Sequence, residues 1–264
     1  MALHRGMDDE RYIGCDIKLL PEDQWVDAAL TAAEENPANA PATSILALGL
    51  PQAVIAPEHL ALVTQKFWRS HGVHLTVGWL DNPPADLRRR ILSHMNAWGA
   101  FADVRFSESA VDPQVRISRG DGGYWSNLGT DILSVPSDQP TMNLEGFTMN
   151  TRESEFVRVV RHETGHTLGF PHEHRRAEIV SKIDRAKAIT FFQDTQGWDP
   201  AKTTQQVLTP LERSALIATA TADPHSIMCY ALPGTIMRDG QPVPGGTDID
   251  ATDRTFAASV YPKR

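Results

Sequence analysis

The stretch VVRHETGHTLGFPHEH, residues 159–174, constrains the chain more than any other part of the sequence. Residues four apart lie on one face of an α-helix, so a helix here projects His162 and His166 side by side. Gly169 is placed to end that helix, because glycine adopts the left-handed conformation of helix C-termini without steric cost. The chain can then turn back, which lets His172 reach the same point in space as the first two histidines.

The three imidazoles predict a metal centre. Neutral imidazole nitrogen is a natural ligand of Zn²⁺, and catalytic zinc sites use three protein ligands and keep a fourth position open. Glu163 follows His162 directly and lies beside the ion, where a general base for the attacking water belongs. We therefore expect one Zn²⁺ per chain, bound by His162, His166 and His172. The alternative is a solvated helix that carries incidental histidines.

Composition narrows the possible partners. The 264 residues can bury the core of one large domain with an appended segment. A net charge of −8 and a pI near 5.7 argue against nucleic acid and anionic membranes as main partners. Two cysteines, Cys15 and Cys229, cannot form a disulfide framework. The first twelve residues contain no apolar run typical of a signal peptide, so the sequence leaves a cytoplasmic location and a non-classical export route open.

The apolar periodicity predicts an α+β fold. Alternating apolar residues predict a strand at residues 73–79, and apolar residues at helical spacing predict a helix at residues 87–98. Thr151 or Ser154 can cap the helix that carries the histidines. We expect the remaining helices near residues 21–35, 183–193 and 209–219 and a short capped helix within residues 247–262, and short strands near residues 104–106, 115–117 and 142–144.

The histidine motif resembles the extended zinc signature of the metzincin metallopeptidases, and most of all that of the astacin branch, H-E-x-x-H-x-x-G-F-x-H-E. Phe170 and Glu173 match this longer form. Further along the chain, SIMCY at residues 226–230 is similar to the astacin Met-turn, S-x-M-H-Y. The resemblance covers roughly residues 71–264, and the order of strand, helix and strand before the motif is also similar.

The resemblance implies the activity of a zinc metalloendopeptidase. It assigns His162, His166 and His172 as zinc ligands and Glu163 as the catalytic acid and base. Met228 would form the turn beneath the zinc, and Tyr230 would be a fifth ligand that swings off the metal to stabilise the transition state. In the family, the glutamate that matches Glu173 often contacts the mature N-terminus.

The resemblance also implies a metzincin-like catalytic domain at residues 71–264. Its upper part, residues 71–172, would contain a twisted, mostly parallel sheet and two long helices. Its lower part, residues 173–264, would be smaller and irregular, with the active-site cleft between the two. The resemblance places Tyr124 and Trp125 at the sheet edge that holds an extended substrate, whereas the residue types alone equally suit plain core aromatics.

This sequence departs from the family pattern in three respects. Cys229 stands where the Met-turn usually has a histidine, the disulfides of the family are missing, and no secretion signal is present. Family members are secreted, so the location of this protein stays open.

The N-terminal segment, residues 1–70, contains a second resemblance. RYIGCDIKLL is similar to the F-x-G-D-I pro-segment motif of astacins, whose aspartate caps the zinc in the latent enzyme. Here Cys15 is inserted between Gly14 and Asp16. Because a thiolate is an excellent zinc ligand, either Cys15 or Asp16 can occupy the water position. The alternative is that Cys15 is a small buried apolar residue in an N-terminal strand or near Cys229.

The resulting prediction is a latent zymogen that becomes active when the chain is cut between about residues 35 and 70. The expected partner is a protein or peptide substrate, bound by a monomer.

One rival interpretation is a zinc-binding interaction module that has lost catalysis, against which the intact Glu163 argues. Another is an intracellular toxin or effector with the same chemistry and a dedicated partner.

Overall fold

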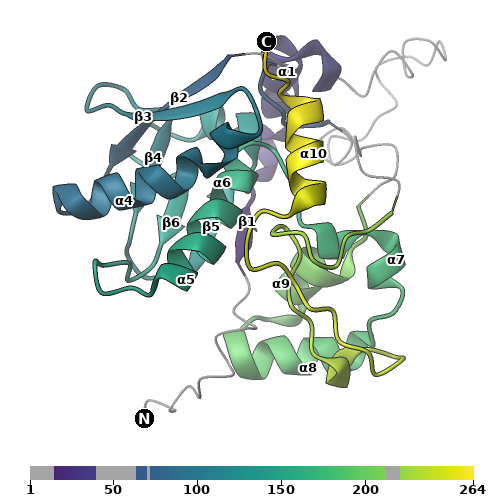
Figure 1. The fold of residues 1–264 in the computed structure, drawn as a ribbon. Helices are drawn as coiled ribbons and strands as arrows, with labels where there is room; N and C mark the ends of the chain where they lie inside the picture. The colour runs from purple at the N-terminus through teal and green to yellow at the C-terminus, as the bar shows by residue number, and fades with distance from the viewer. Residues whose placement is uncertain (1–14, 40–63, 70–71, 212–220) are drawn as a thin grey trace, which may run out of the picture.

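The computed structural model describes residues 15–39, 64–69, 72–211 and 221–264 (Figure 1). Its centre is one six-stranded sheet with the strand order β1-β5-β6-β4-β2-β3. All neighbouring strands are parallel except β5 and β6, which are antiparallel. The strands are β1 (Asp16–Lys18), β2 (Val73–Trp79), β3 (Val104–Glu108), β4 (Val115–Ser118), β5 (Tyr124–Asn127) and β6 (Met142–Leu144). The predicted α+β fold with a mostly parallel sheet is confirmed.

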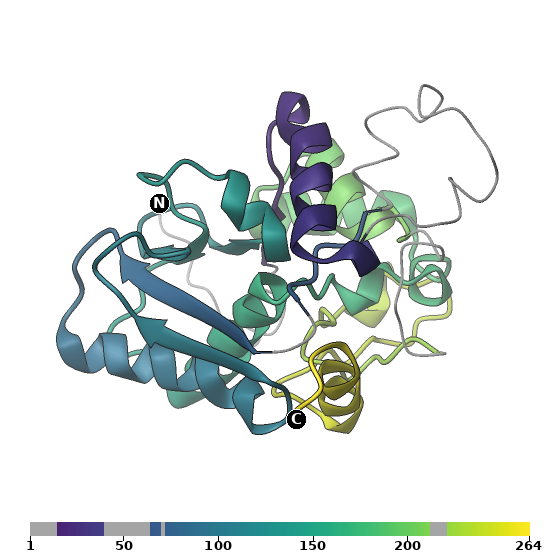
Figure 2. The same ribbon diagram turned by 90° about the horizontal axis from the view of Figure 1, so that it is seen from above.

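Two long helical segments pack on this sheet. The first is α4 (Ala85–Met95), which continues as a 3₁₀ turn, η5 (Asn96–Ala100). The second joins α5 (Glu153–Glu155), the π-helical η7 (Phe156–Val160) and α6 (Arg161–Thr167), and it contacts α4. Viewed from above, α4 runs beside the long strands β2 and β3 (Figure 2). Their shared core is apolar and fully buried, with Trp98, Phe156 and Ile117 among its largest side chains.

The second helical segment begins differently from the prediction. Its N-cap residue is Arg152, which makes no side-chain cap, so neither Thr151 nor Ser154 caps it. The Thr151 hydroxyl instead accepts a hydrogen bond from the backbone N–H of Thr148, at 3.0 Å, and closes the turn that precedes the helix. Ser154 lies inside the first helical turn and is exposed.

The lower part of the chain consists of short helices and loops around a separate apolar cluster that includes Phe192, Val207 and Leu232. The prediction of a helix near 183–193 is confirmed by α8, whereas most of the predicted helix at 209–219 lies outside the described residues. The elements of this part are η8 (Glu173–Arg175), α7 (Ala177–Val180), α8 (Arg185–Gln196), α9 (Pro200–Thr203), the π-helical η9 (Thr204–Leu208), η11 (Gly234–Ile236) and α10 (Ala251–Val260).

The N-terminal segment is integrated into this fold. Strand β1 runs along the boundary between the two parts, and η2 (Glu22–Gln24), α1 (Trp25–Glu35) and η3 (Pro37–Asn39) follow it (Figure 1). Helix α1 packs on η6 (Gly129–Ser134). Phe67 and Trp68 are buried in the main core, so the core reaches back to residues before 71. Within the described residues, no helix has the length and apolar character needed to cross a membrane.

Candidate metal centre

The three motif histidines converge on one point. The Nε2 atoms of His162 and His166 lie 3.1 Å apart, and those of His166 and His172 lie 2.9 Å apart. Nitrogens that share a tetrahedral Zn²⁺ at about 2.05 Å are separated by about 3.3 Å, so these distances suit a common ion. His162 and His166 come from adjacent turns of α6, as their spacing predicts.

His172 reaches the same point because the helix ends at Gly169. The φ angle of Gly169 is 90°, which confirms the predicted left-handed turn. The backbone N–H of Phe170 donates to the Gly165 carbonyl at 2.9 Å, and that of Gly169 donates to the His166 carbonyl at 2.8 Å. These two bonds are the Schellman pattern, and they reverse the chain so that His172 returns under the helix.

The hydrogen bonds made by Nδ1 of His162 and His166 determine that Nε2 of each ring faces the metal centre. The Nδ1 of His162 bonds to the carbonyl of Ile227, and the Nδ1 of His166 bonds to the carbonyl of Phe170 at 2.7 Å. A carbonyl oxygen only accepts, so each Nδ1 carries the proton and each Nε2 presents a lone pair. Burial lowers the pKa of His162 to about 4 and lowers the pKa values of His166 and His172 well below the usual range. The imidazoles are therefore neutral, as metal ligands must be, and this donor set fits Zn²⁺.

The predicted Met-turn, residues 226–230, lies against the motif helix. A Cβ atom added to Gly165 would lie 2.4 Å from the Met228 sulfur, so a larger residue there would force the Met228 side chain to move. The Ser226 hydroxyl donates to Oδ1 of Asp253 at 2.6 Å, and the Ile227 N–H donates to its Oδ2 at 2.9 Å. Asp253, from α10, thus holds the same turn whose Ile227 carbonyl orients His162.

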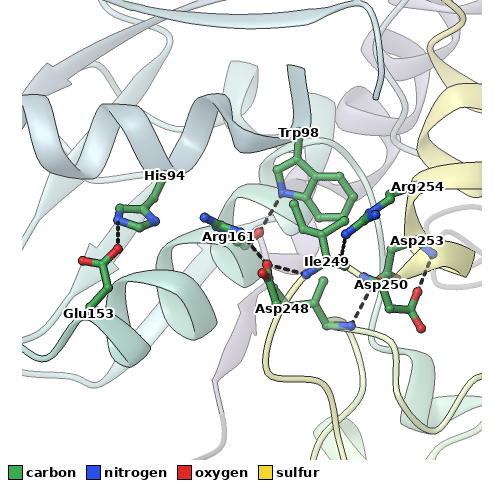
Figure 3. A network of polar contacts seen from close by, with 10 residues as sticks. His94, Trp98, Glu153, Arg161, Asp248, Ile249, Asp250, Asp253 and Arg254 are labelled. Carbon is green, nitrogen blue, oxygen red and sulfur yellow. Dashed lines mark hydrogen bonds and ion pairs between the residues drawn. The ribbon is translucent and has the colours of Figure 1, made fainter. Parts of the chain in front are cut away.

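A wider polar network ties the motif helix to the chain before α10 (Figure 3). The Trp98 indole donates to the Arg161 carbonyl at 2.9 Å, and the Arg161 guanidinium pairs with Asp248. Asp250 and Asp253 form a capping box at the start of α10. The network therefore connects the motif helix to Asp253, which holds the predicted Met-turn.

A small cavity of about 60 Å³ lies beside His162, between the upper and lower parts of the chain. Glu163 and Tyr124 line it from above, and Tyr230 lines it from below. Glu163 is fully buried, and burial raises the pKa of its carboxyl well above the usual range. Burial likewise raises the pKa of the Tyr230 phenol, so the hydroxyl keeps its proton and can donate a hydrogen bond.

The N-terminal segment enters this cavity. The sulfur of Cys15 lies 2.7 Å from Nε2 of His162, 3.1 Å from that of His172 and 3.5 Å from that of His166. The four donor atoms all lie within 4.8 Å of one another. Asp16 points elsewhere, since its carboxylate pairs with the Lys202 ammonium at 2.6 Å. Burial, followed by the charge of Glu163, raises the pKa of the Cys15 thiol, whereas a bound Zn²⁺ would favour the thiolate.

The other predicted residues lie as follows. Tyr124 and Trp125 are half-buried in β5, and Trp125 pairs in register with Asp16 of β1. The Glu173 carboxylate accepts the Asp223 N–H at 3.1 Å, and burial raises the pKa of Glu173 to about 7. Cys15 and Cys229 are both free thiols.

Three residues of the site region were not predicted from the sequence: His174, Gln206 and Asp253. His174 is fully buried, and its Nε2 donates to the Gln206 carbonyl at 3.0 Å, 32 residues further along the chain. His174 could have been singled out from the sequence because it lies two residues after His172. Gln206 and Asp253 come from distant elements that carry no motif.

Comparisons with known proteins agree with this geometry. No protein-family profile matches the sequence. Over 98 residues, which are 37% of this chain and 21% of the relative, the sequence is 35% identical to zinc metalloproteinase nas-27 of Caenorhabditis elegans. The matched region is thus about a fifth of that relative's length.

Solved structures are similar over most of the chain. One structure of myroilysin has a TM-score of 0.71 and 29% identity over 77% of this chain and 98% of its own. Another has a TM-score of 0.57 and 28% identity over 75% and 86%. High choriolytic enzyme 1, a hatching enzyme zinc-protease of Oryzias latipes, shares the fold, with a TM-score of 0.51 and 19% identity over 75% and 96%. In its motif, its metal-ligand geometry and its fold, the chain is similar to zinc metalloproteinases of the astacin type.

Proposed function

We propose that the chain is an endopeptidase that hydrolyses peptide bonds within proteins and is made in a latent form. The observation that carries the proposal is that three neutral imidazoles share one cluster of donor atoms, beside a small cavity lined by His162, Glu163 and Tyr230. His162, His166 and His172 would hold the Zn²⁺. When bound, the ion supplies Lewis acidity and lowers the pKa of a water molecule toward neutrality.

Glu163 is the proposed acid and base. Its carboxylate would take the proton of the attacking water and later pass that proton to the leaving amine. The raised pKa of the buried carboxyl suits the second role, because the site retains the proton until the amine needs it. The Tyr230 hydroxyl would donate a hydrogen bond to the oxygen that gains negative charge in the transition state.

Strand β5 is the proposed docking edge for the substrate. In the described structure β1 pairs with β5 through Asp16, Ile17 and Lys18, and no further strand lies beyond β1 among the described residues. Without β1, β5 would be an edge strand with unpaired backbone groups, to which an extended peptide can add. Tyr124 and Trp125 would then contact the substrate.

The position of Cys15 supports latency. Its sulfur occupies the fourth corner of the donor set, where a catalytic site needs an open position. We propose that residues 1–70 act as an inhibitory segment with Cys15 as the capping ligand, and that residues 71–264 form the catalytic domain, against whose core Phe67 and Trp68 pack. Asp16 would hold the segment in place through Lys202 instead of binding the metal.

Digestion of a peptide library tests the proposal. The zinc-loaded chain is compared before and after limited proteolysis in the 40–63 region, with Glu163→Gln as the matched control. We expect the cut wild-type protein to cleave peptides internally, and Glu163→Gln to retain zinc but lose cleavage. Zinc-loaded, cut protein that cleaves no peptide would favour the zinc-binding interaction module instead.

A further inference from the structure

Strand β1 is hydrogen-bonded on both of its edges. On one edge it pairs with β5. On the other, the backbone N–H of Ile17 donates to Oε1 of Gln206 at 3.3 Å, and Nε2 of Gln206 donates to the Ile17 carbonyl at 3.2 Å. The side-chain amide of Gln206 thus takes the place of a neighbouring strand, because it pairs with both the N–H and the C=O of one residue. We call this pair of hydrogen bonds the Gln206 bracket.

Gln206 lines the groove that β1 occupies beside β5. Gln206 is 4% exposed and lies in the π-helical turn η9, a type of turn that is frequent at functional sites. A buried primary amide needs partners for both its oxygen and its nitrogen, and in this structure Ile17 supplies one of each. When β1 is absent, another extended main chain in the groove would satisfy the same two atoms.

The bracket does not depend on the direction or the side chain of the bound segment. The N–H and C=O of one residue in an extended strand point to the same side. The terminal torsion of glutamine is broad, so the amide can turn to match either order of the two groups. β1 runs parallel to β5, and a substrate that runs antiparallel can make the same pair of bonds.

The bracket is also connected to the catalytic side. The backbone carbonyl of Gln206 accepts the Nε2–H of His174 at 3.0 Å, and the His174 ring stacks on Tyr230. Ile17 lies two residues after Cys15, whose sulfur is at the metal centre. A main chain held by Gln206 is therefore held at a fixed distance along the strand from the reacting position.

We propose that Gln206 is a substrate-binding residue that brackets the main chain of the residue two positions from the one at the metal, on the side opposite β5. This inference rests on the proposed peptidase function. Together β5 and Gln206 form a groove that recognises extended, unfolded polypeptide by its backbone, irrespective of the side chain at that position.

The test uses a series of otherwise identical peptides in which one backbone N–H after another is methylated. Activity is measured on the zinc-loaded chain, after limited proteolysis where the intact chain is latent. In the wild-type protein, methylation at the bracketed position should lower kcat/KM by about 3–10-fold, the range of one lost hydrogen bond. The loss should appear in KM, because the bracket binds substrate and transition state alike.

Three variants separate binding from structure. Gln206→Leu keeps the shape and should lose the sensitivity to methylation at that one position, while positions paired with β5 stay sensitive. Gln206→Glu keeps an acceptor for the N–H and should restore the sensitivity, which a loss of folding would not do. Gln205→Ala, an exposed neighbour in the same turn, should behave as the wild type.

Two outcomes would count against the inference and differ from each other. A methylation penalty that is unchanged in both Gln206→Leu and Gln206→Glu, in active protein, would overturn the assignment of Gln206 alone. A wild-type protein that cleaves no member of the series would overturn the peptidase proposal and this inference with it.

Discussion

The ring of His174 stacks on the ring of Tyr230, with centroids 3.9 Å apart and planes inclined by 21°. Burial lowers the pKa of His174 to about 3, so the imidazole is neutral and contacts the phenol through its face. The Tyr230 ring also meets His172, at 4.5 Å between centroids, and the two histidine rings are themselves 4.9 Å apart. Tyr230 thus packs in one cluster of rings with a metal-site histidine and a second histidine that is hydrogen-bonded to Gln206.

Replacement of Tyr230 by phenylalanine should lower kcat and leave the fold and the zinc content unchanged. The variant keeps the stacked ring and removes only the hydroxyl, so the expected loss is roughly 10–1,000-fold, the range for one oxyanion donor. Steady-state kinetics and zinc analysis on the same preparation measure it. An unchanged kcat would remove the Tyr230 hydroxyl from the mechanism.

His174→Ala should lower kcat only where Tyr230 is present. If His174 positions the phenol, the loss in kcat seen in the wild-type background should disappear in the Tyr230→Phe background, and a double-mutant cycle shows this as non-additivity. His174→Phe retains a ring to stack and should recover part of the loss. Additive effects of the two substitutions would mean that His174 acts on stability alone.

The sequence predicted the parts of this site that depend on local geometry. The spacing of His162 and His166 on one helix, and the turn at Gly169, follow from helix periodicity and from the left-handed preference of glycine. Local patterning predicted no strand at residues 124–127, where only the family resemblance placed a sheet edge, whereas the structure has β5 there. That strand is stabilised by pairing with β1 and β6, which no local pattern reveals.

Contacts across long sequence separations were beyond local prediction. Ile17 and Gln206 are 189 residues apart, and Ser226 reaches Asp253 from a different element. The π-helical turns η7 and η9 were not predicted either, because a widened turn follows neither the 3.6-residue nor the 2-residue period. The position of Cys15 among the histidines was one of two alternatives that the sequence left open.

Removal of zinc should abolish peptidase activity. Metal binding stabilises the fold that contains the site, so chelation should also lower Tm, and added Zn²⁺ should restore both. His166→Ala removes the ligand that lies between the other two and should prevent stoichiometric binding. Full activity after exhaustive chelation would contradict the assignment of a zinc centre.

Asp253→Ala should weaken zinc binding by about 10–100-fold, the range for residues that orient a metal ligand. The substitution leaves the Ser226 hydroxyl and the Ile227 N–H without their acceptor, and the turn that orients His162 loosens. Asp250→Ala is the matched control, because it breaks the same capping box without touching the Met-turn. Competition with a chelator of known affinity measures both variants, and equal effects would show that only the helix cap matters.

The last prediction concerns latency. The intact zinc-loaded chain should be nearly inactive, because the Cys15 sulfur takes the open position of the metal centre. Cys15→Ala should raise the activity of the intact chain to a large fraction of that of protein cut between residues 40 and 63, without any cut. Asp16→Ala should raise it less, since Asp16 anchors the segment through the exposed end of Lys202 and a partly exposed ion pair stabilises only modestly.

Cys229→Ala is the control for loss of a buried thiol, and it should leave the chain latent. A thiol reagent that traps Cys15 off the metal should activate the wild type and have no effect on Cys15→Ala. Intact wild-type protein that already matches the cut protein would show that residues 1–70 do not inhibit, and activation by Asp16→Ala but not by Cys15→Ala would assign the cap to the carboxylate.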